Sequence, residues 1–123
     1  MKISLEDGSA TYRIASYAQG QVAVNEQRLT RSLVIMPEAL IRDWPPEGFE
    51  SFAAEHFAMI AALHPEIVLL GTGATLRFPA PDLLAPLYHA GIGVEVMDTG
   101  AACRTYNILM AEGRTVAAAL LMI

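Results

Sequence analysis

The feature that most limits the folds open to this chain is an alternation of short apolar runs with helix-like segments, from residue 67 to residue 122. The apolar runs cover 67–70, 93–97 and 115–122, and their β-branched and aliphatic residues favour buried strands. The segments between them, 81–90 and 100–112, have the boundaries of helices. A strand–helix–strand order implies parallel strands joined by right-handed crossovers. We therefore predict an α/β fold with a mixed, mostly parallel central β-sheet flanked by helices.

Proline, glycine and short polar residues mark the ends of the two predicted helices. Pro81 stands where a helix can begin, and Gly91 stands where it can end. Pro86 fits only if this helix starts late, because the N–H groups of a first turn have no partner within the helix. Asp98 and Thr99 are residue types that cap the start of a helix, and they precede the second one.

The first third of the chain has the pattern of β structure instead. Alternating apolar residues predict three short strands, over 11–17, 21–24 and 28–36, with tight turns between them. Short turns favour antiparallel pairing. We expect an N-terminal antiparallel β layer attached to the central sheet, so that residues 1–123 form one domain with three layers (β+α/β/α).

A proline-rich connection is predicted over 41–48, between the β layer and the alternating part of the chain. After about Ser51 the apolar residues follow a helical period, through Phe52, Phe57 and Ile60. Pro65 ends this predicted helix, since proline interrupts the helical hydrogen-bond pattern.

The composition is typical of a folded protein. Hydrophobic residues make up 54% of the chain and charged residues 17%. No apolar run approaches the ~18–20 residues that a membrane-spanning helix needs, and the first residues resemble neither a signal peptide nor a transit peptide. We therefore expect a soluble protein of the cytoplasm, with no membrane span.

Charge and metal-ligand patterns argue against several classes of function. The net charge is −5, and the eight basic residues are scattered, so no nucleic-acid partner is expected. The single cysteine, Cys103, excludes an internal disulfide and a cysteine-rich zinc site. The three histidines, His56, His64 and His89, do not have the spacing of metal ligands. We expect neither a metal nor a cofactor.

The turn Gly71-Thr72-Gly73 follows a buried strand, as the phosphate-binding turn of a nucleotide site does. The third glycine of a dinucleotide motif is missing, because Leu76 stands in its place, and the next helix begins only near Pro81. A P-loop is excluded because no Gly-Lys-Ser/Thr follows. Two interpretations stay open: a sharp turn that needs glycine, or a ligand-binding rim at the carboxyl end of the sheet.

The helix start at Asp98 and Thr99 is a second candidate for anion binding, because free N–H groups and the helix dipole favour negative charge. Both turns follow strands of one parallel set, so we expect them to lie side by side. Arg77 and Arg104 follow these turns and could then hold a carboxylate or phosphate. The alternative is ordinary capping, with Arg77 paired to Asp82 and Arg104 paired to Asp98.

Cys103 lies near the start of the same helix, where the dipole can lower the pKa of a thiol. A cysteine nucleophile also needs a histidine base, for which His89 is the nearest candidate in sequence. The neighbours Ala102 and Tyr106 instead indicate a buried, slowly reacting thiol. Asn107 is an unfavourable residue inside a helix, and we expect it to make a structural hydrogen bond. The sequence thus contains no complete catalytic set.

Three segments carry a family resemblance: SLVIMPEALIRDWPPEGF at 32–49, PEIVLLGTGATLRFP at 65–79 and GIGVEVMDTGAACRTYNILMAEGR at 91–114. Their motifs are the glycine turn, Arg-Phe-Pro at 77–79 and D-T-x-x-A-C-R-T-Y-N at 98–107. Together they resemble the family of mitochondrial respiratory complex I assembly factor 3 and its bacterial and archaeal relatives of unknown function.

The resemblance covers roughly residues 10–121 and implies both a fold and a function. The implied fold is a central mixed sheet flanked by helices and a β layer. The implied function is that of an accessory protein that pairs with another assembly factor while complex I (NADH:ubiquinone oxidoreductase) is built. The resemblance implies no catalytic residues.

Two functions therefore compete. The first is a non-catalytic assembly protein that binds a protein partner, such as a respiratory complex subunit, through exposed features at Trp44-Pro45-Pro46 and Phe78-Pro79, unless Trp44 simply fills the core. The second is a small-molecule or anion-binding protein, or an enzyme, whose site joins 71–73, Arg77 and 98–104. Self-association is compatible with either.

Overall fold

The computed structural model describes residues 11–123 of the chain. The strands are β1 (Ile14–Ala18), β2 (Gln21–Val24), β3 (Gln27–Leu29), β4 (Leu33–Met36), β5 (Ala39–Ile41), β6 (Ile67–Gly71), β7 (Gly93–Met97) and β8 (Val116–Leu120). The helices are α1 (Ala54–Ala61), α2 (Ala85–His89) and α3 (Thr99–Ala111), together with the short 3₁₀ helices η2 (Phe49–Ser51) and η3 (Pro81–Leu84).

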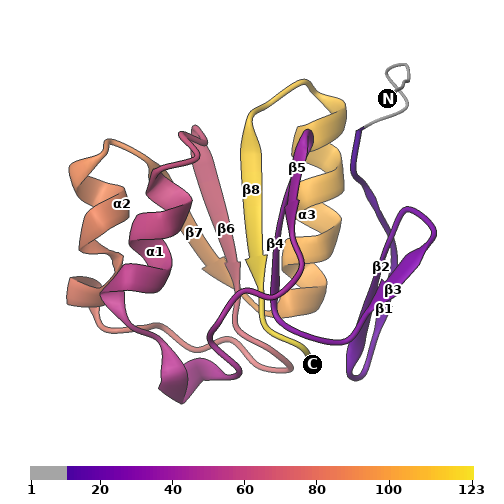
Figure 1. Ribbon diagram of the computed structural model, residues 1–123, viewed down its shortest axis with the longest axis horizontal. Helices are drawn as coiled ribbons and strands as arrows, with labels where there is room; N and C mark the ends of the chain where they lie inside the picture. The colour runs from indigo at the N-terminus through magenta and orange to yellow at the C-terminus, as the bar shows by residue number, and fades with distance from the viewer. Residues whose placement is uncertain (1–10) are drawn as a thin grey trace.

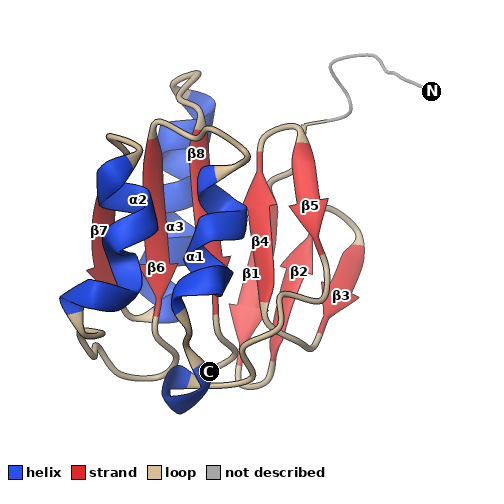
Figure 2. Ribbon diagram, turned by 60° about the vertical axis from the view of Figure 1, so that its left-hand side comes forward, coloured by secondary structure: helices blue, strands red, loops and turns tan. Residues whose placement is uncertain are grey.

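The strands form two sheets. The central sheet has the order β5-β4-β8-β6-β7. β6 pairs in parallel with β7 and with β8, whereas β4 pairs antiparallel with β5 and with β8. The predicted mixed sheet is therefore confirmed. Its parallel strands, β6, β7 and β8, are the ones that the strand–helix–strand order predicts. The remaining strands form the antiparallel sheet β1-β2-β3, which is the expected N-terminal β layer (Figure 2).

The central sheet separates two apolar cores. Successive side chains of a strand point to opposite faces, so Val68 and Leu70 of β6 face one core and Leu69 faces the other. Figure 1 shows α1 and α2 on one side of the sheet and α3 on the other, with the small sheet beside α3. The cores follow this division, because one includes Phe57 of α1 and the second includes Tyr106 of α3. The expected three-layer arrangement is confirmed.

The predicted helix over 81–90 consists of two pieces. η3 begins at Pro81, and α2 continues from Ala85 with Pro86 in its first turn. Because α2 starts only at Ala85, Pro86 falls in its first turn, where its missing N–H removes no helical hydrogen bond. The predicted late start of this helix is therefore correct. Gly91, which follows, has a φ of +74°, in the left-handed region that favours glycine.

The strand predicted over 28–36 is wrong as a single element. The chain leaves the small sheet at Leu29 and enters the central sheet at Leu33, where β4 pairs with β8. The segment between them, 30–32, contains no apolar residue. It therefore contributes no apolar side chain to either core. The proline-rich connection is also shorter than predicted, because Ile41 still belongs to β5.

Across the part of the chain described here, none of the helices combines the length and apolar character that crossing a membrane requires.

Candidate functional site

The glycine turn after β6 and the start of α3 are in direct contact, as predicted from their places after two parallel strands. The Gly73 N–H donates to Thr99 Oγ1 at 2.8 Å, and the Thr99 N–H donates to the Gly73 carbonyl at 2.9 Å. The Thr72 N–H donates to the Met97 carbonyl at 3.0 Å. These bonds join the carboxyl ends of β6 and β7 to the first turn of α3.

The chain beyond β8 is bound to the same point. Thr99 Oγ1 donates to the Leu121 carbonyl at 2.7 Å, and the Leu121 N–H donates to the Gly71 carbonyl at 3.0 Å. A Cβ atom on Gly71 would stand 2.9 Å from Leu120 Cδ2 and 3.0 Å from Thr99 Cα. Gly73 has a φ of +98°, which side chains strongly disfavour. Both glycines thus meet a structural demand, one of packing and one of backbone conformation.

Three N–H groups at the start of α3, those of Thr99, Ala101 and Ala102, have partners within the protein. The Asp98 carboxylate accepts the Ala101 N–H at 2.8 Å, and the Asp98 carbonyl accepts the Ala102 N–H at 3.0 Å. Gly100 is buried against Tyr17, whose ring carbon Cε1 would stand 2.9 Å from an added Cβ. This is the pattern of ordinary helix capping.

Arg77 and Arg104 do not meet at this junction, because Arg104 Nη1 would stand 3.4 Å from a Cβ added to Gly100 whereas Arg77 turns to η2. The Arg77 guanidinium lies 4.0 Å from the ring centroid of Phe49, and its Nη2 pairs with Glu50 at 3.2 Å. Arg104 Nη1 bonds to the hydroxyl of Tyr17, whose ring centroid lies 5.9 Å from the guanidinium. Phe49 packs against the core under α1 and α2, whereas Tyr17 packs against the core under α3. The two arginines therefore serve opposite faces of the central sheet.

The arginines also have partners other than Asp82 and Asp98, the acids expected from the sequence. Glu50 reaches Arg77 from η2, and Tyr17 reaches Arg104 from the small sheet. Each aromatic ring adds a cation–π attraction to its arginine. Because both partners lie far away in sequence, no local spacing identifies them.

Thr72 shapes the loop that follows the glycine turn. Its hydroxyl donates to the Thr75 carbonyl at 2.7 Å and accepts the Arg77 N–H at 3.1 Å. With Arg77 fixed on η2, the loop presents two apolar side chains, since Leu76 is 50% exposed and Phe78 is 72% exposed. The residues that the sequence marks as a ligand rim therefore hold an exposed apolar loop.

Phe78 borders a groove of about 500 Å³ along β7. Glu95 is the one charged residue that borders it; the others are Phe78, Pro79, Pro81, Leu84, Tyr88, Val94 and Val96. Tyr88 of α2 is 52% exposed on this groove. In the sequence, only Phe78-Pro79 indicates this surface. The residues that α2 and β7 add to the groove come together only in the folded chain.

Trp44, by contrast, is not a surface feature. It is 2% exposed and packs at ring-centroid distances of 5.8 Å from both Phe52 and Phe57. Its Nε1–H donates to the His56 carbonyl at 3.3 Å. The alternative that Trp44 fills the core is therefore correct.

Cys103 is buried, with 1% of its surface exposed. Burial raises the pKa of its thiol from 9.0 to about 12, and the Arg104 charge offsets only part of that rise. A raised pKa leaves little thiolate at neutral pH, and the thiolate is the reactive species. This environment is therefore in keeping with the expected slow reaction of Cys103. His89 lies at the end of α2 on the opposite side of the sheet (Figure 1).

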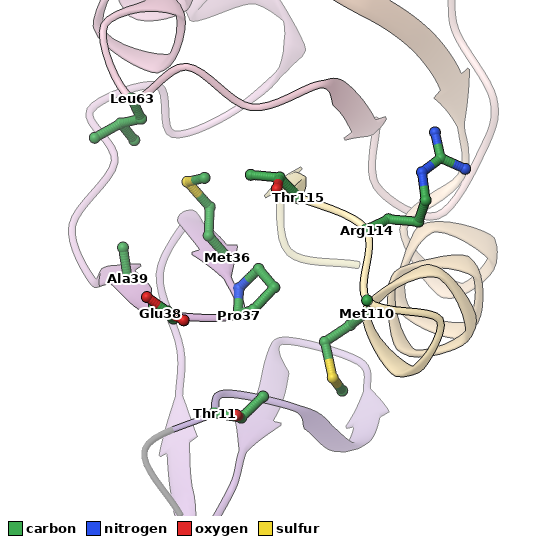
Figure 3. A pocket seen from close by; sticks show the side chains of 10 residues that line it. Thr11, Met36, Pro37, Glu38, Ala39, Leu63, Met110, Arg114 and Thr115 are labelled. Carbon is green, nitrogen blue, oxygen red and sulfur yellow. The ribbon is translucent and has the colours of Figure 1, made fainter. Parts of the chain in front are cut away.

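A second pocket, of about 450 Å³, lies at the opposite end of the sheet from the glycine turn. Figure 3 shows Met36 directed into it between Leu63 and Thr115, while the Arg114 guanidinium points away. Arg114 Nε bonds to Glu66 at 3.1 Å. The pKa of Glu66 is held below its ordinary value, first by the hydrogen bond from the Thr115 N–H and then by Arg114. No sequence motif points to this pocket.

Comparison with known proteins places the chain in a family. Residues 14–121 match a family model described as protein of unknown function (DUF498/DUF598). The NADH dehydrogenase [ubiquinone] 1 alpha subcomplex assembly factor 3 of Bos taurus is 34% identical over 110 residues, which are 88% of this chain and 59% of the bovine protein. The chain thus spans about three fifths of that relative's length.

Bacterial proteins match over more of their length. A protein of Francisella tularensis named 13 kDa major membrane protein is 27% identical over 94% of this chain and 95% of its own. The crystal structure of a Bordetella parapertussis protein superimposes with a TM-score of 0.87 at 40% identity, covering 93% of this chain and 98% of that one. The chain therefore belongs to the DUF498/DUF598 family, in keeping with the resemblance to complex I assembly factor 3 that its motifs carry.

Proposed function

We propose that this chain is a non-catalytic accessory protein that binds protein partners during the assembly of respiratory complex I (NADH:ubiquinone oxidoreductase). The observation that carries the proposal is the similarity to assembly factor 3, which extends over 88% of the chain. The partner would be a complex I subunit or a second assembly factor. The site of action would be the cytoplasm.

The surface of the molecule supports binding through apolar contact. Phe78 and Tyr88, both more than half exposed, flank one groove beside β7. Aromatic side chains are enriched among the residues that dominate the energetics of protein–protein interfaces. Arg77 is tied to η2 and Thr72 braces the loop, so Phe78 is presented without a large ordering cost on binding.

In this proposal the residues of the candidate ligand site act as a scaffold. Gly71 and Gly73 allow the close approach of β6 and α3, and Asp98 and Thr99 close the junction. Their hydrogen-bonding groups are directed at one another, which favours a structural role over anion binding. Cys103 belongs to the core beneath them.

Deletion of the gene in the organism that encodes it tests the proposal. Native gels stained for NADH dehydrogenase activity would measure assembled complex I. We expect less of the assembled complex and an accumulation of subassemblies, both reversed when the chain is supplied again. A deletion strain with the normal amount of active complex I would contradict the proposal.

A further inference from the structure

The outer edge of β7 has the geometry of a strand-binding site. β7 is the last strand of the central sheet, and Figure 2 shows it at the edge farthest from β5. Among residues 11–123, no strand pairs with its outer side. Unpaired backbone groups on such an edge can template the pairing of another strand.

Two residues of β7 direct their backbone groups outward. The Gly93 N–H donates to the Glu66 carbonyl at 3.3 Å, and the Met97 carbonyl accepts the Thr72 N–H at 3.0 Å. In a parallel pair, every second residue bonds to the same neighbour. Gly93, Glu95 and Met97 therefore face β6, and the N–H and C=O groups of Val94 and Val96 face away from it.

The side chains beside this edge define what an added strand must carry. Val94 and Val96 lie on the α2 side of the sheet, where they partly pack against the core. An added strand would place alternate side chains on that same side, over the groove of Leu84, Tyr88 and Phe78. Those positions must be apolar. The position between them would face Glu95, which is exposed on the other side of the sheet.

The charge of Glu95 decides between a second copy and a different partner. Suppose that two copies pair antiparallel through β7, and that the outward N–H and C=O groups of Val94 and Val96 all form hydrogen bonds. Val94 of each copy then lies opposite Val96 of the other, and the pair is centred on Glu95. It places the two Glu95 carboxylates directly opposite each other, at the closer Cα spacing of about 4.5 Å. Like charges directly opposite each other destabilise a sheet. Each copy also carries a net charge of −5.

We propose that β7 binds an extended segment of a different protein, antiparallel to itself, with the pattern apolar–basic–apolar. The basic side chain pairs with Glu95, and the two apolar side chains enter the groove beside Tyr88 and Phe78. Backbone hydrogen bonds to Val94 and Val96 supply the register, as in other cases of strand addition. This inference rests on the proposed function, since it names the surface and the chemistry of the partner that assembly requires.

Two matched peptides test the proposal on the full chain. One is acetyl-Thr-Val-Lys-Val-Thr-amide, and the other replaces its lysine with glutamate. Each is titrated into isotope-labelled protein while the backbone amide resonances are followed by NMR. We expect the lysine peptide to shift the Val94 and Val96 amides while leaving Val22 and Val24 of the small sheet unchanged. The glutamate peptide should bind about threefold more weakly, as a single cross-strand charge pair predicts.

The variant Glu95→Lys supplies the control, because its exposed position tolerates the change without loss of the fold. It should reverse the order of the two peptides. The proposal is overturned if neither peptide shifts Val94 and Val96 up to millimolar concentration, or if both peptides bind equally. It is also overturned if sedimentation shows a dimer in which the Val94 and Val96 amides are protected from exchange.

Failure of this proposal is distinguishable from failure of the proposed function. If deletion lowers assembled complex I but the peptides leave β7 unchanged, the assembly role stands and the binding surface lies elsewhere. If the peptides bind as expected but deletion leaves complex I intact, the strand-binding edge stands and serves another process.

Discussion

The side chain of Asn107 in α3 makes two hydrogen bonds with the backbone of Ile14 in β1. Its Oδ1 accepts the Ile14 N–H at 2.9 Å, and its Nδ2 donates to the Ile14 carbonyl at 2.7 Å. The Asn25 N–H donates to the Arg13 carbonyl at 2.9 Å, so Arg13 bonds toward β2 and the backbone groups of Ile14 face away from it, toward Asn107. One side chain thereby fastens the small sheet to the central layer.

Replacement of Asn107 should weaken this attachment. Asn107→Ala leaves a partly buried N–H and C=O without their side-chain partners, and the free energy of unfolding should fall by about 1–3 kcal/mol. Asn107→Asp retains an acceptor but turns a carboxylate toward the Ile14 carbonyl. At neutral pH it should be at least as destabilising as the alanine. Urea unfolding measures both, and an Asn107→Asp protein as stable as the wild type would show that the pair contributes little.

Gly71 should not tolerate a side chain. In Gly71→Ala the Cβ would collide with Leu120 Cδ2 and with the backbone of Thr99, which should cost about 1–3 kcal/mol as overpacking does. Gly48→Ala is the matched control, because no atom lies within 4 Å of its added Cβ. Thermal unfolding of the two variants compares them. Equal melting temperatures would mean that the junction of β6, β8 and α3 is looser than the contacts indicate.

Stability should fall at alkaline pH, in part because of Cys103. Its pKa is raised by burial to about 12 in the folded protein, from 9.0, so above pH 9 the unfolded chain loses a proton that the folded chain keeps. The contribution of the protonated thiol to the free energy of unfolding is fully present below pH 9 and is lost as the pH rises toward 12. The slope approaches about 1.4 kcal/mol per pH unit for one proton.

The variant Cys103→Ala isolates this effect. Burial also raises the pKa of Tyr106, which gives a loss of the same sign that persists in the variant. Urea unfolding between pH 8 and pH 11 should therefore show a shallower decline in the variant than in the wild type. Parallel declines would mean that the thiol is not protected. Native labelling of Cys103 as fast as that of free cysteine would mean the same.

The sequence predicted the parallel half of the fold because its signals are local. The run at 67–70 is bounded by Pro65 and the glycine turn, and Asp98 stands where a cap is needed. The contact between Gly73 and Thr99 then follows from a general rule, since parallel strands end at one edge of a sheet.

The parts that the sequence did not predict depend on contacts between distant segments. The break between β3 and β4 appears only when β4 pairs with β8, and the partners of Arg77 and Arg104 come from η2 and β1. For Trp44 the sequence left both an exposed and a buried position open, and the ring fills the core near α1. That β7 is an edge strand follows from the strand order, which no local pattern contains.

Phe78 is the residue whose removal should separate binding from stability. Phe78→Ser removes an exposed ring, so the melting temperature should stay nearly unchanged, as is usual for surface substitutions. Ile108→Ser on α3 is the matched control, because Ile108 is 59% exposed and lies away from the groove. A large loss of stability in Phe78→Ser would mean that the ring supports the fold.

Purification of the tagged chain from cells that make complex I tests the central claim most directly, with the copurifying complex I subunits quantified by mass spectrometry. We predict that complex I subunits or a second assembly factor accompany the wild type and Ile108→Ser in equal amounts and are largely lost from Phe78→Ser. A wild-type chain that retains neither, although it is folded and present at its natural level, would contradict an assembly role based on protein binding.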